Sequence, residues 1–234
     1  MKKINVKSYE ELSRIAAGFV SDLILAKPDA TLGLATGSTP VGLYNQLIAM
    51  VQKRDIRFSQ VKTFNLDEYV GLNRSHPQSY FRFMQEHLFE KVDIPFYQIH
   101  IPNGEAIDLQ EECQRYERLI EENGPIDLQI LGLGVNGHIG FNEPGTSFNS
   151  RTHVVSLAPS TREANARFFS SIEDVPDQAI TMGIDTIMRS RHIVLLAYGD
   201  RKQEAIRRLF DGDVDEDFPA SILKKHPNVT VLYG

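Results

Sequence analysis

Short apolar segments alternate with amphipathic ones along this chain, and this alternation limits its fold more than any other feature of the sequence. The segments expected to form strands are 31–35, 61–66, 98–101, 126–133, 153–157, 179–182, 192–198 and 228–233. The segments expected to form helices are 8–23, 40–51, 79–89, 105–122, 160–169 and 201–210. Strands that alternate with helices are typical of the α/β class. The sequence therefore predicts a doubly wound, mainly parallel, Rossmann-like sheet with helices on both faces.

Length, charge and cysteine content narrow the class of protein further. A chain of 234 residues can bury one sizeable core, so we expect a single domain over residues 1–234. Its formal net charge of −6 does not favour a nucleic-acid partner. The one cysteine, Cys113, lies at helical spacing from Tyr116 and Ile120, which indicates a buried thiol in a reducing compartment. The sequence shows neither a signal peptide nor an apolar run long enough to span a membrane, so we expect a cytoplasmic protein without a membrane partner.

The apolar run 126–133 leads into the most informative loop of the chain. Glycines interrupt the sequence between residues 132 and 137, and His138 and Glu143 follow within one short polar segment. Open α/β sheets build their sites where buried strands end, and a carboxylate near a histidine orients its ring and supports its charge. A tight turn with a solvated histidine and carboxylate would show the same local pattern. The loop therefore predicts a site that transfers protons, with a ligand-free turn as the alternative.

A second loop of this kind follows the strand expected over 31–35. Its residues Gly37, Ser38 and Thr39 come directly before Pro40, which suits the start of a helix. Small residues and hydroxyls at a helix start present backbone N–H groups to an anion, so the loop is a candidate phosphate site. It lacks the lysine of a P-loop and the spacing of a dinucleotide site. A capped helix without a ligand is the alternative.

Two acidic residues, Asp67 and Glu68, follow the strand expected over 61–66. We expect only one of them to point into the crevice where the other loops end. Asp67 is the candidate general base, and Glu68 is expected to be more exposed or structural. An isolated acidic pair is more commonly a solvated turn, which stays the alternative.

Two cations lie where they can reach an anion held by the loop 36–39. Arg162 stands at the start of the helix expected over 160–169, and Lys202 follows the strand expected over 192–198. Segments of small and polar residues flank 153–169, so we expect a mobile flap over about 151–176, although an ordinary insertion fits equally well. The histidines show no metal-ligand spacing, and we expect neither a metal nor a cofactor.

Three segments in this order resemble the glucosamine-6-phosphate deaminase family, and the resemblance runs nearly from end to end. They are residues 36–40 (TGSTP), 64–69 (FNLDEY) and 134–144 (GVNGHIGFNEP), with further similarity at 160–162 (STR) and 199–202 (GDRK). The resemblance implies an enzyme of amino-sugar metabolism that converts glucosamine 6-phosphate and water to fructose 6-phosphate and ammonia.

The resemblance also implies a role for each candidate residue. Asp67 is similar to the family's base for moving a proton from carbon 2 to carbon 1, and His138 with Glu143 to its ring-opening pair. Asn136 stands in the same catalytic loop. The positions that match the family's phosphate site are Gly37, Ser38, Thr39, Arg162 and Lys202.

The sequence departs from the family's pattern at two places. Asn136 stands where many members carry aspartate, so support for a charged His138 must come chiefly from Glu143. The sequence ends at Gly234, whereas larger relatives extend further and form hexamers activated by N-acetylglucosamine 6-phosphate. We therefore expect a monomer without that activation. Two other functions remain open: a 6-phosphogluconolactonase-like hydrolase, which shares the fold and a Gly-His loop, and a non-catalytic sugar-phosphate sensor.

Overall fold

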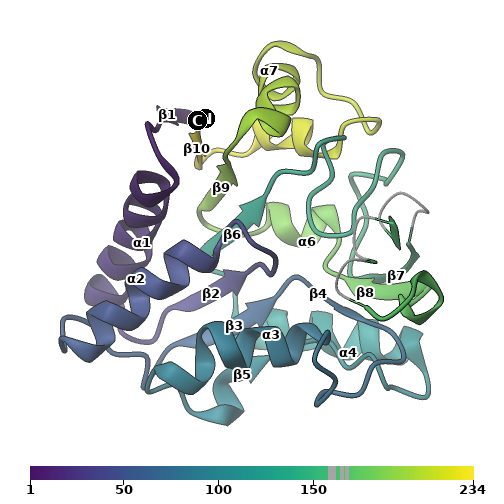
Figure 1. Ribbon diagram of the computed structural model, residues 1–234, viewed down its shortest axis with the longest axis horizontal. Helices are drawn as coiled ribbons and strands as arrows, with labels where there is room; N and C mark the ends of the chain where they lie inside the picture. Colours follow the sequence, from purple (N-terminus) through teal and green to yellow (C-terminus); the bar gives the residue numbers. More distant parts are fainter. Residues whose placement is uncertain (158–161, 164–165, 167–168) are drawn as a thin grey trace.

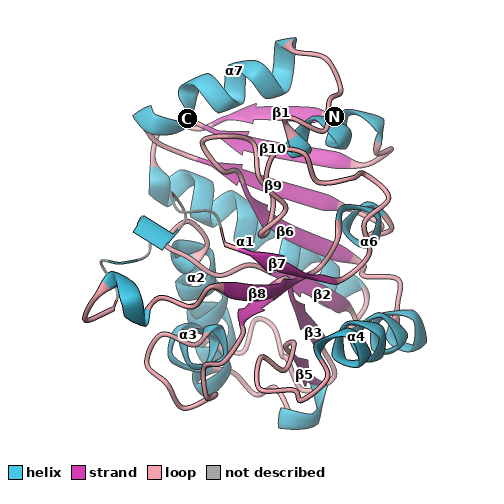
Figure 2. Ribbon diagram, turned by 90° about the vertical axis from the view of Figure 1, so that its right-hand side faces the viewer, coloured by secondary structure: helices cyan, strands magenta, loops and turns pink. Residues whose placement is uncertain are grey.

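The main sheet confirms the predicted α/β architecture. The computed structural model describes residues 1–157, 162–163, 166 and 169–234. Within these residues, seven parallel strands lie in the order β1 (Lys2–Asn5), β10 (Val229–Tyr233), β9 (Ile193–Ala197), β6 (Leu128–Gly132), β2 (Thr31–Leu34), β3 (Lys62–Asn65) and β5 (Ile99–His100). Figure 2 shows this order from top to bottom. The edge strand β1 was not expected.

Helices cover both faces of this sheet, as predicted. The α-helices of the described residues are α1 (Tyr9–Ala26), α2 (Val41–Gln52), α3 (Tyr80–His87), α4 (Leu109–Asn123), α6 (Ile184–Met188) and α7 (Gln203–Asp211). Short 3-10 helices cover Phe89–Lys91, Phe96–Gln98, Ile172–Asp174, Asp200–Lys202 and Pro219–Lys225. The first three α-helices pack on one face and the last three on the other (Figures 1 and 2).

Local sequence explains why these elements form where they do. Helix α1 begins after Ser8, whose hydroxyl accepts a hydrogen bond from the backbone N–H of Glu11 at 3.1 Å. Glu11 reaches back to the backbone N–H of Lys7 at 2.7 Å, so both ends of a capping pair are satisfied. Strand β6 is buried on both faces because Ile130 packs on one side of the sheet and Leu131 on the other.

A second, smaller sheet was not expected. It contains the antiparallel strands β4 (Asp67–Tyr69), β8 (Gln178–Thr181) and β7 (His153–Ser156). The chain passes from one sheet to the other at Leu66, whose backbone N–H donates to Leu34 in the main sheet and whose carbonyl accepts from Met182. Residues 67–69 therefore form a strand and not a solvated turn. The strands expected over 153–157 and 179–182 exist, but they belong to this sheet.

The strand order reverses between β2 and β6, which makes this place a topological switch point. From β2 the chain continues outward to β3 and β5, and β6 starts the other half of the sheet on the opposite side of β2. Ligands of doubly wound sheets bind at the carboxyl ends of strands at such a switch point. Much of the helix expected over 160–169 lies outside the described residues. Within the described part of the chain, no helix is both long and apolar enough to cross a membrane.

Candidate active site

The candidate residues follow neighbouring strands of the main sheet. Residues 36–39 follow β2, residues 134–143 follow β6, and Lys202 comes after β9. Asp67 follows β3 by way of Leu66 and begins β4. All these segments therefore leave the sheet at its carboxyl edge, beside the β2–β6 switch point (Figure 1).

Glycines shape the loop that carries His138. The backbone N–H of Gly134 donates to the carbonyl of His138 at 2.9 Å, which closes the loop. A Cβ atom at Gly134 would lie 2.4 Å from the His138 ring, so any side chain here would displace the imidazole. Gly137 has a φ of +88°, and a Cβ there would lie 2.2 Å from the ring of Phe218. The glycines are therefore required for the placement of the histidine.

Asn136 bridges His138 and Glu143. Its Oδ1 accepts hydrogen bonds from the backbone N–H of His138 at 3.2 Å and lies 2.7 Å from the His138 Nδ1. Its Nδ2 donates to the Glu143 Oε2 at 2.6 Å, and that oxygen is 3.7 Å from the His138 Nδ1. Because the Asn136 atom facing the ring accepts from a backbone N–H, it is the amide oxygen, and Nδ1 of the neutral ring carries the proton. The Nε2 lone pair of His138 is then available as a base.

The surroundings of His138 keep its ring neutral. Burial lowers the pKa of His138, the charge of Lys202 lowers it further, and only Glu143 opposes these effects. A histidine with a lowered pKa is unprotonated at neutral pH and can accept a proton there. The site therefore holds a ready base at the end of β6.

Asp67 lies next to this loop and is almost fully buried. Asp67 is only 6% exposed, and a Cβ atom at Gly140 would lie 3.5 Å from the Asp67 Oδ2. Burial raises the pKa of Asp67 to about 8, and the charge of Glu68 adds to the rise. Within the described residues no hydrogen bond ends on the Asp67 carboxylate. Once it is ionised, a buried carboxylate whose lone pairs are not engaged can take a proton from a ligand.

Glu68 was expected to be either more exposed than Asp67 or structural. The first alternative is wrong, and the contacts of Glu68 agree with the second. Glu68 is 3% exposed, and its carboxylate accepts backbone N–H bonds from Tyr69, Tyr80 and Phe81, each at 2.8 Å. Two of these donors lie in the first turn of α3, so the carboxylate caps that helix. Burial raises the pKa of Glu68 to about 7, although these hydrogen bonds oppose the rise. Glu68 thus binds α3 to the strand that carries Asp67.

The loop 36–39 leaves its backbone donors free. Gly37 has a φ of +89°, and it is exposed together with Ser38. Within the described part of the chain, no protein acceptor is bonded to the N–H groups of residues 37–39. The hydroxyl of Tyr9 holds the loop from outside, since it contacts the carbonyls of Ser38 and Thr39 at 3.0 Å. Sequence reasoning missed Tyr9, because nothing local marks a contact with residues 29 and 30 positions away.

Lys202 contacts the start of the His138 loop, whereas Arg162 contacts residues 172–177. Lys202 donates from Nζ to the carbonyl of Leu133 at 2.6 Å, and burial lowers its pKa. The Arg162 guanidinium instead contacts Asp177 at 3.0 Å and the carbonyls of Ile172 and Val175 at 3.0 and 3.1 Å. All three partners lie within residues 172–177.

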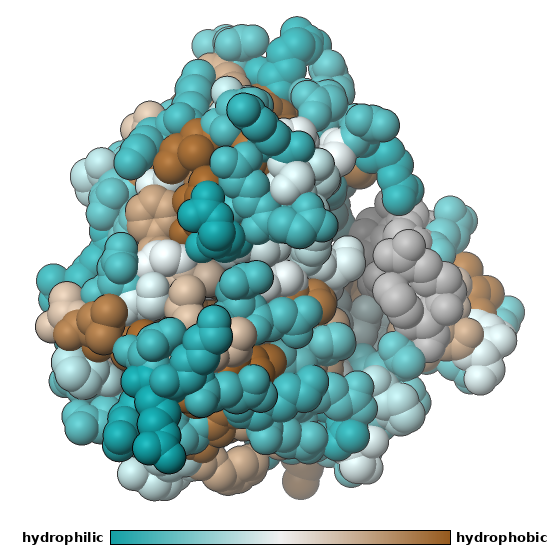
Figure 3. All heavy atoms as spheres, turned by 60° about the vertical axis from the view of Figure 1, so that its left-hand side comes forward, coloured by the Kyte–Doolittle hydropathy of each residue, from teal (hydrophilic) through white to brown (hydrophobic). Residues whose placement is uncertain are grey.

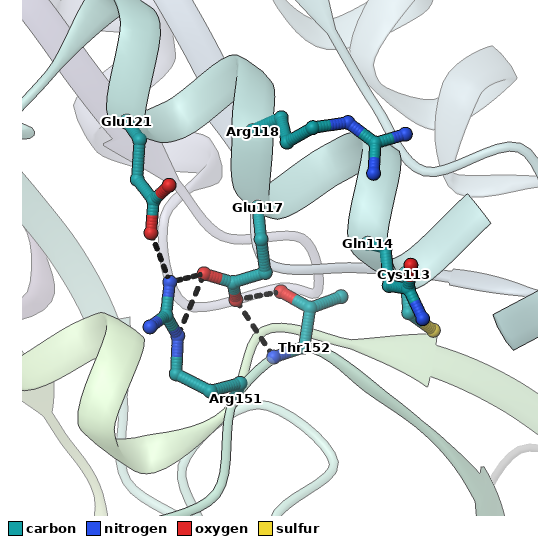
Figure 4. Close-up of a pocket in the computed structure, with 7 residues that line it drawn as sticks. All are labelled: Cys113, Gln114, Glu117, Arg118, Glu121, Arg151 and Thr152. Atoms are coloured by element: carbon teal, nitrogen blue, oxygen red, sulfur yellow. Dashed lines mark hydrogen bonds and ion pairs between the residues drawn. The ribbon is translucent and has the colours of Figure 1, made fainter. Parts of the chain in front are cut away.

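A separate cavity of about 340 Å³ lies between α4 and the residues just before β7 (Figure 4). Glu117 lines this cavity, and its carboxylate accepts hydrogen bonds from Arg151 at 2.5 Å and from the backbone N–H of Thr152 at 2.7 Å. Cys113 lines the same cavity, and burial raises its pKa to about 11, which agrees with the expected buried thiol. None of the candidate site residues lines this cavity. Among the described residues no group of acids, histidines and cysteine is arranged to hold a metal ion.

Comparisons with known proteins match nearly the whole chain to one family. A family model described as glucosamine-6-phosphate isomerases/6-phosphogluconolactonase matches residues 7–232. A glucosamine-6-phosphate deaminase of Geobacillus sp. (strain WCH70) is 57% identical over 232 residues, which cover 99% of this chain and 92% of the relative. Glucosamine-6-phosphate deaminase 1 of Bacillus subtilis (strain 168) is 54% identical, with 99% and 96% covered.

Solved structures show the same pattern. One described as a monomeric glucosamine-6-phosphate deaminase superposes with a TM-score of 0.97 at 54% identity, and covers 100% of this chain and 97% of its own. The 6-phosphogluconolactonase of Thermotoga maritima superposes with a TM-score of 0.77 at 20% identity, over 99% and 98% of the two chains. At that identity the second likeness shows a shared fold alone.

Proposed function

This chain belongs to the family of the glucosamine-6-phosphate isomerases and 6-phosphogluconolactonases, and we propose that within it the chain acts as a glucosamine-6-phosphate deaminase. The reaction converts glucosamine 6-phosphate and water to fructose 6-phosphate and ammonia. The observation that carries the proposal is the meeting of two bases at one sheet edge. The loop of His138 passes directly beside the buried carboxylate of Asp67.

Ring opening is the task of His138. The anomeric hydroxyl must lose a proton and the ring oxygen must gain one, and a neutral imidazole performs both transfers through Nε2. The Asn136 amide oxygen accepts a hydrogen bond from the Nδ1–H of His138, and the Asn136 amide nitrogen donates to Glu143. Asn136 therefore links the imidazole ring to the Glu143 carboxylate. When the ring takes the proton, the Glu143 carboxylate 3.7 Å away stabilises the imidazolium.

Isomerisation and deamination follow at carbon 2. Asp67 takes the carbon-2 proton of the open-chain sugar, and the carbonyl oxygen of carbon 1 gains a proton that the amino group releases, which gives an enol-type intermediate. Asp67 then delivers a proton to carbon 1, which leaves a hydroxyl group at carbon 1 and a carbon–nitrogen double bond at carbon 2. Water adds to that bond, and ammonia leaves as the ketone forms. Asp67 must be ionised to start this step, and the positive charge of a substrate ammonium beside it favours the ionised form.

Phosphate binding at the 36–39 loop aligns the sugar for these transfers. The free N–H groups of residues 37–39 and the hydroxyls of Ser38 and Thr39 supply donors, and Lys202 supplies a positive charge. A local cation is needed because the chain carries a net charge of −6. For Arg162 to join them, it must exchange its contacts within 172–177. The flap expected over about 151–176 lies partly outside the described residues.

We also propose a monomer in the cytoplasm. The structure described as a monomeric deaminase matches this chain over its full length. On the face shown in Figure 3, hydrophilic residues predominate and hydrophobic ones form small, separate patches, as on the surface of a monomer. The single free thiol of Cys113 suits a reducing compartment. Sedimentation that gives a mass near 26.5 kDa supports the monomer, and a mass of a hexamer contradicts it.

A product assay tests the function. The protein is mixed with glucosamine 6-phosphate, and ammonia and fructose 6-phosphate are measured separately. The proposal predicts equal amounts of both products, and little turnover of unphosphorylated glucosamine. Hydrolysis of 6-phosphogluconolactone without ammonia release would instead favour the lactonase. Binding of the amino sugar phosphate without either product would favour a sensor.

A further inference from the structure

We propose that Thr181 is a positioning residue that sets the placement of the ring-opening loop against Asp67. The inference rests on the proposed function, because it concerns how two steps of that reaction share one site. Neither the sequence motifs nor the resemblance marks this threonine.

Thr181 ends strand β8 and lies beside Asp67. The two residues are paired across the antiparallel ladder between β8 and β4, and Thr181 is fully buried. Residues paired in this way have side chains about 5 Å apart on the same face of the sheet. The base for the carbon-2 step and the threonine therefore stand on one rigid pair of strands.

The Thr181 hydroxyl binds the loop that carries the ring-opening pair. Its Oγ1 accepts a hydrogen bond from the backbone N–H of Phe141 at 3.1 Å, and Phe141 lies between His138 and Glu143 in the chain. The donor is buried, so it has no water to replace this acceptor. A bond to the centre of the loop thus fixes residues on both sides of it.

Gly140 shows how closely the three parts meet. Its φ is +58°, and a Cβ atom there would lie 3.0 Å from the Thr181 Oγ1 and 3.5 Å from the Asp67 Oδ2. Loop backbone, threonine hydroxyl and catalytic carboxylate therefore converge at one point. The hydrogen bond from Phe141 to Thr181 holds the loop at this distance from Asp67.

The Asn142 side chain also holds the loop, but the separation between the loop and Asp67 is set by Thr181. The Asn142 Nδ2 donates to the carbonyls of Ile139 at 2.8 Å and Met182 at 2.9 Å. These bonds close the turn and attach it beyond the end of β8. The bond to Thr181 is the one that attaches the loop opposite Asp67 itself.

The experiment compares Thr181→Val, which keeps the shape and removes the acceptor, with Thr181→Ser, which keeps the acceptor and removes a methyl group. A misplacement of about 1 Å costs up to about 100-fold in rate, so kcat of Thr181→Val should fall by about 10- to 100-fold with KM nearly unchanged. Thr181→Ser should keep most of the activity. Amide hydrogen exchange at Phe141 should become faster in the valine variant and stay slow in the serine variant.

Each outcome decides the inference. It is overturned if Thr181→Val keeps the kcat of the parent, if the serine variant is as slow as the valine variant, or if exchange at Phe141 is the same in all three proteins. Thr181→Ala replaces the valine variant in the comparison if the latter does not fold. A parent protein that makes no ammonia overturns the proposed function instead, and the inference falls with it.

Discussion

Replacement of Asp67 by asparagine should make the protein more stable at neutral and alkaline pH. The carboxyl group is buried, and burial raises its pKa to about 8 from an ordinary value of 3.8. An aspartate in the unfolded chain ionises as the pH rises through 4, whereas the folded protein keeps its proton up to about pH 8. Between about pH 4 and pH 8 the unfolded state binds fewer protons than the folded state, so the free energy of unfolding falls as the pH rises. Asparagine has no proton to lose and removes this dependence.

The size of the effect follows from the two pKa values. At 1.36 kcal/mol per pH unit, Asp67 lowers the free energy of unfolding by about 2 kcal/mol at pH 5 and by about 4 kcal/mol at pH 7, relative to pH 3. Above pH 8 the cost stops growing, since the carboxyl group is then ionised in both states. The loss is present at high pH and disappears as the pH falls below 4.

Urea unfolding at pH 5, 7 and 8.5 measures the effect for the parent, for Asp67→Asn and for the control Asp22→Asn. Asp22 is exposed on α1, so its replacement should leave the pH dependence of the parent unchanged. The quantity to compare is the slope of the unfolding free energy with pH, because a buried amide changes the absolute stability as well. Parallel slopes in the parent and Asp67→Asn would refute the claim that burial keeps this carboxyl group protonated.

The remaining predictions concern the ring-opening pair and phosphate binding. Asn136→Asp adds a negative charge beside His138 and should raise its pKa, so the acidic limb of the rate profile moves to higher pH. Glu143→Gln removes a charge that raises this pKa, so the limb should move to lower pH and ring opening should slow. If the limb moves in neither variant, His138 is not the titrating group. Lys202→Ala should weaken substrate binding by about 1–3 kcal/mol, measured by calorimetry with glucosamine 6-phosphate. Unchanged affinity would exclude Lys202 from the phosphate site.

The sequence was sufficient to predict the main sheet and the edge of it where the candidate segments lie. Strands buried on both faces, such as β6, have an unmistakable apolar pattern, and parallel strands end at a common edge. Residues 36–39 and 134–143 were therefore placed correctly at that edge without any knowledge of tertiary contacts. The glycines of residues 134–143 indicated a tight loop, and the structure shows what they accommodate, including the ring of His138 against Gly134.

What the sequence could not predict depends on partners far away in the chain. Strand β4 has only three residues, and it forms because β8 pairs with it, more than 100 residues later. Glu68 is buried because three backbone donors happen to surround it, two of them at the start of α3. Local composition favours a solvated acidic turn at this place.

The central claim is that Asp67 moves the carbon-2 proton, and solvent exchange at that carbon tests it most directly. Glucosamine 6-phosphate is incubated in D₂O with the parent or with Asp67→Asn, and loss of the carbon-2 proton signal is followed by NMR. Asparagine keeps the shape of the side chain but lacks the basic oxygen. The account predicts that turnover and exchange fall together by about two to four orders of magnitude, while substrate binding changes much less. Exchange at the rate of the parent in Asp67→Asn would contradict it.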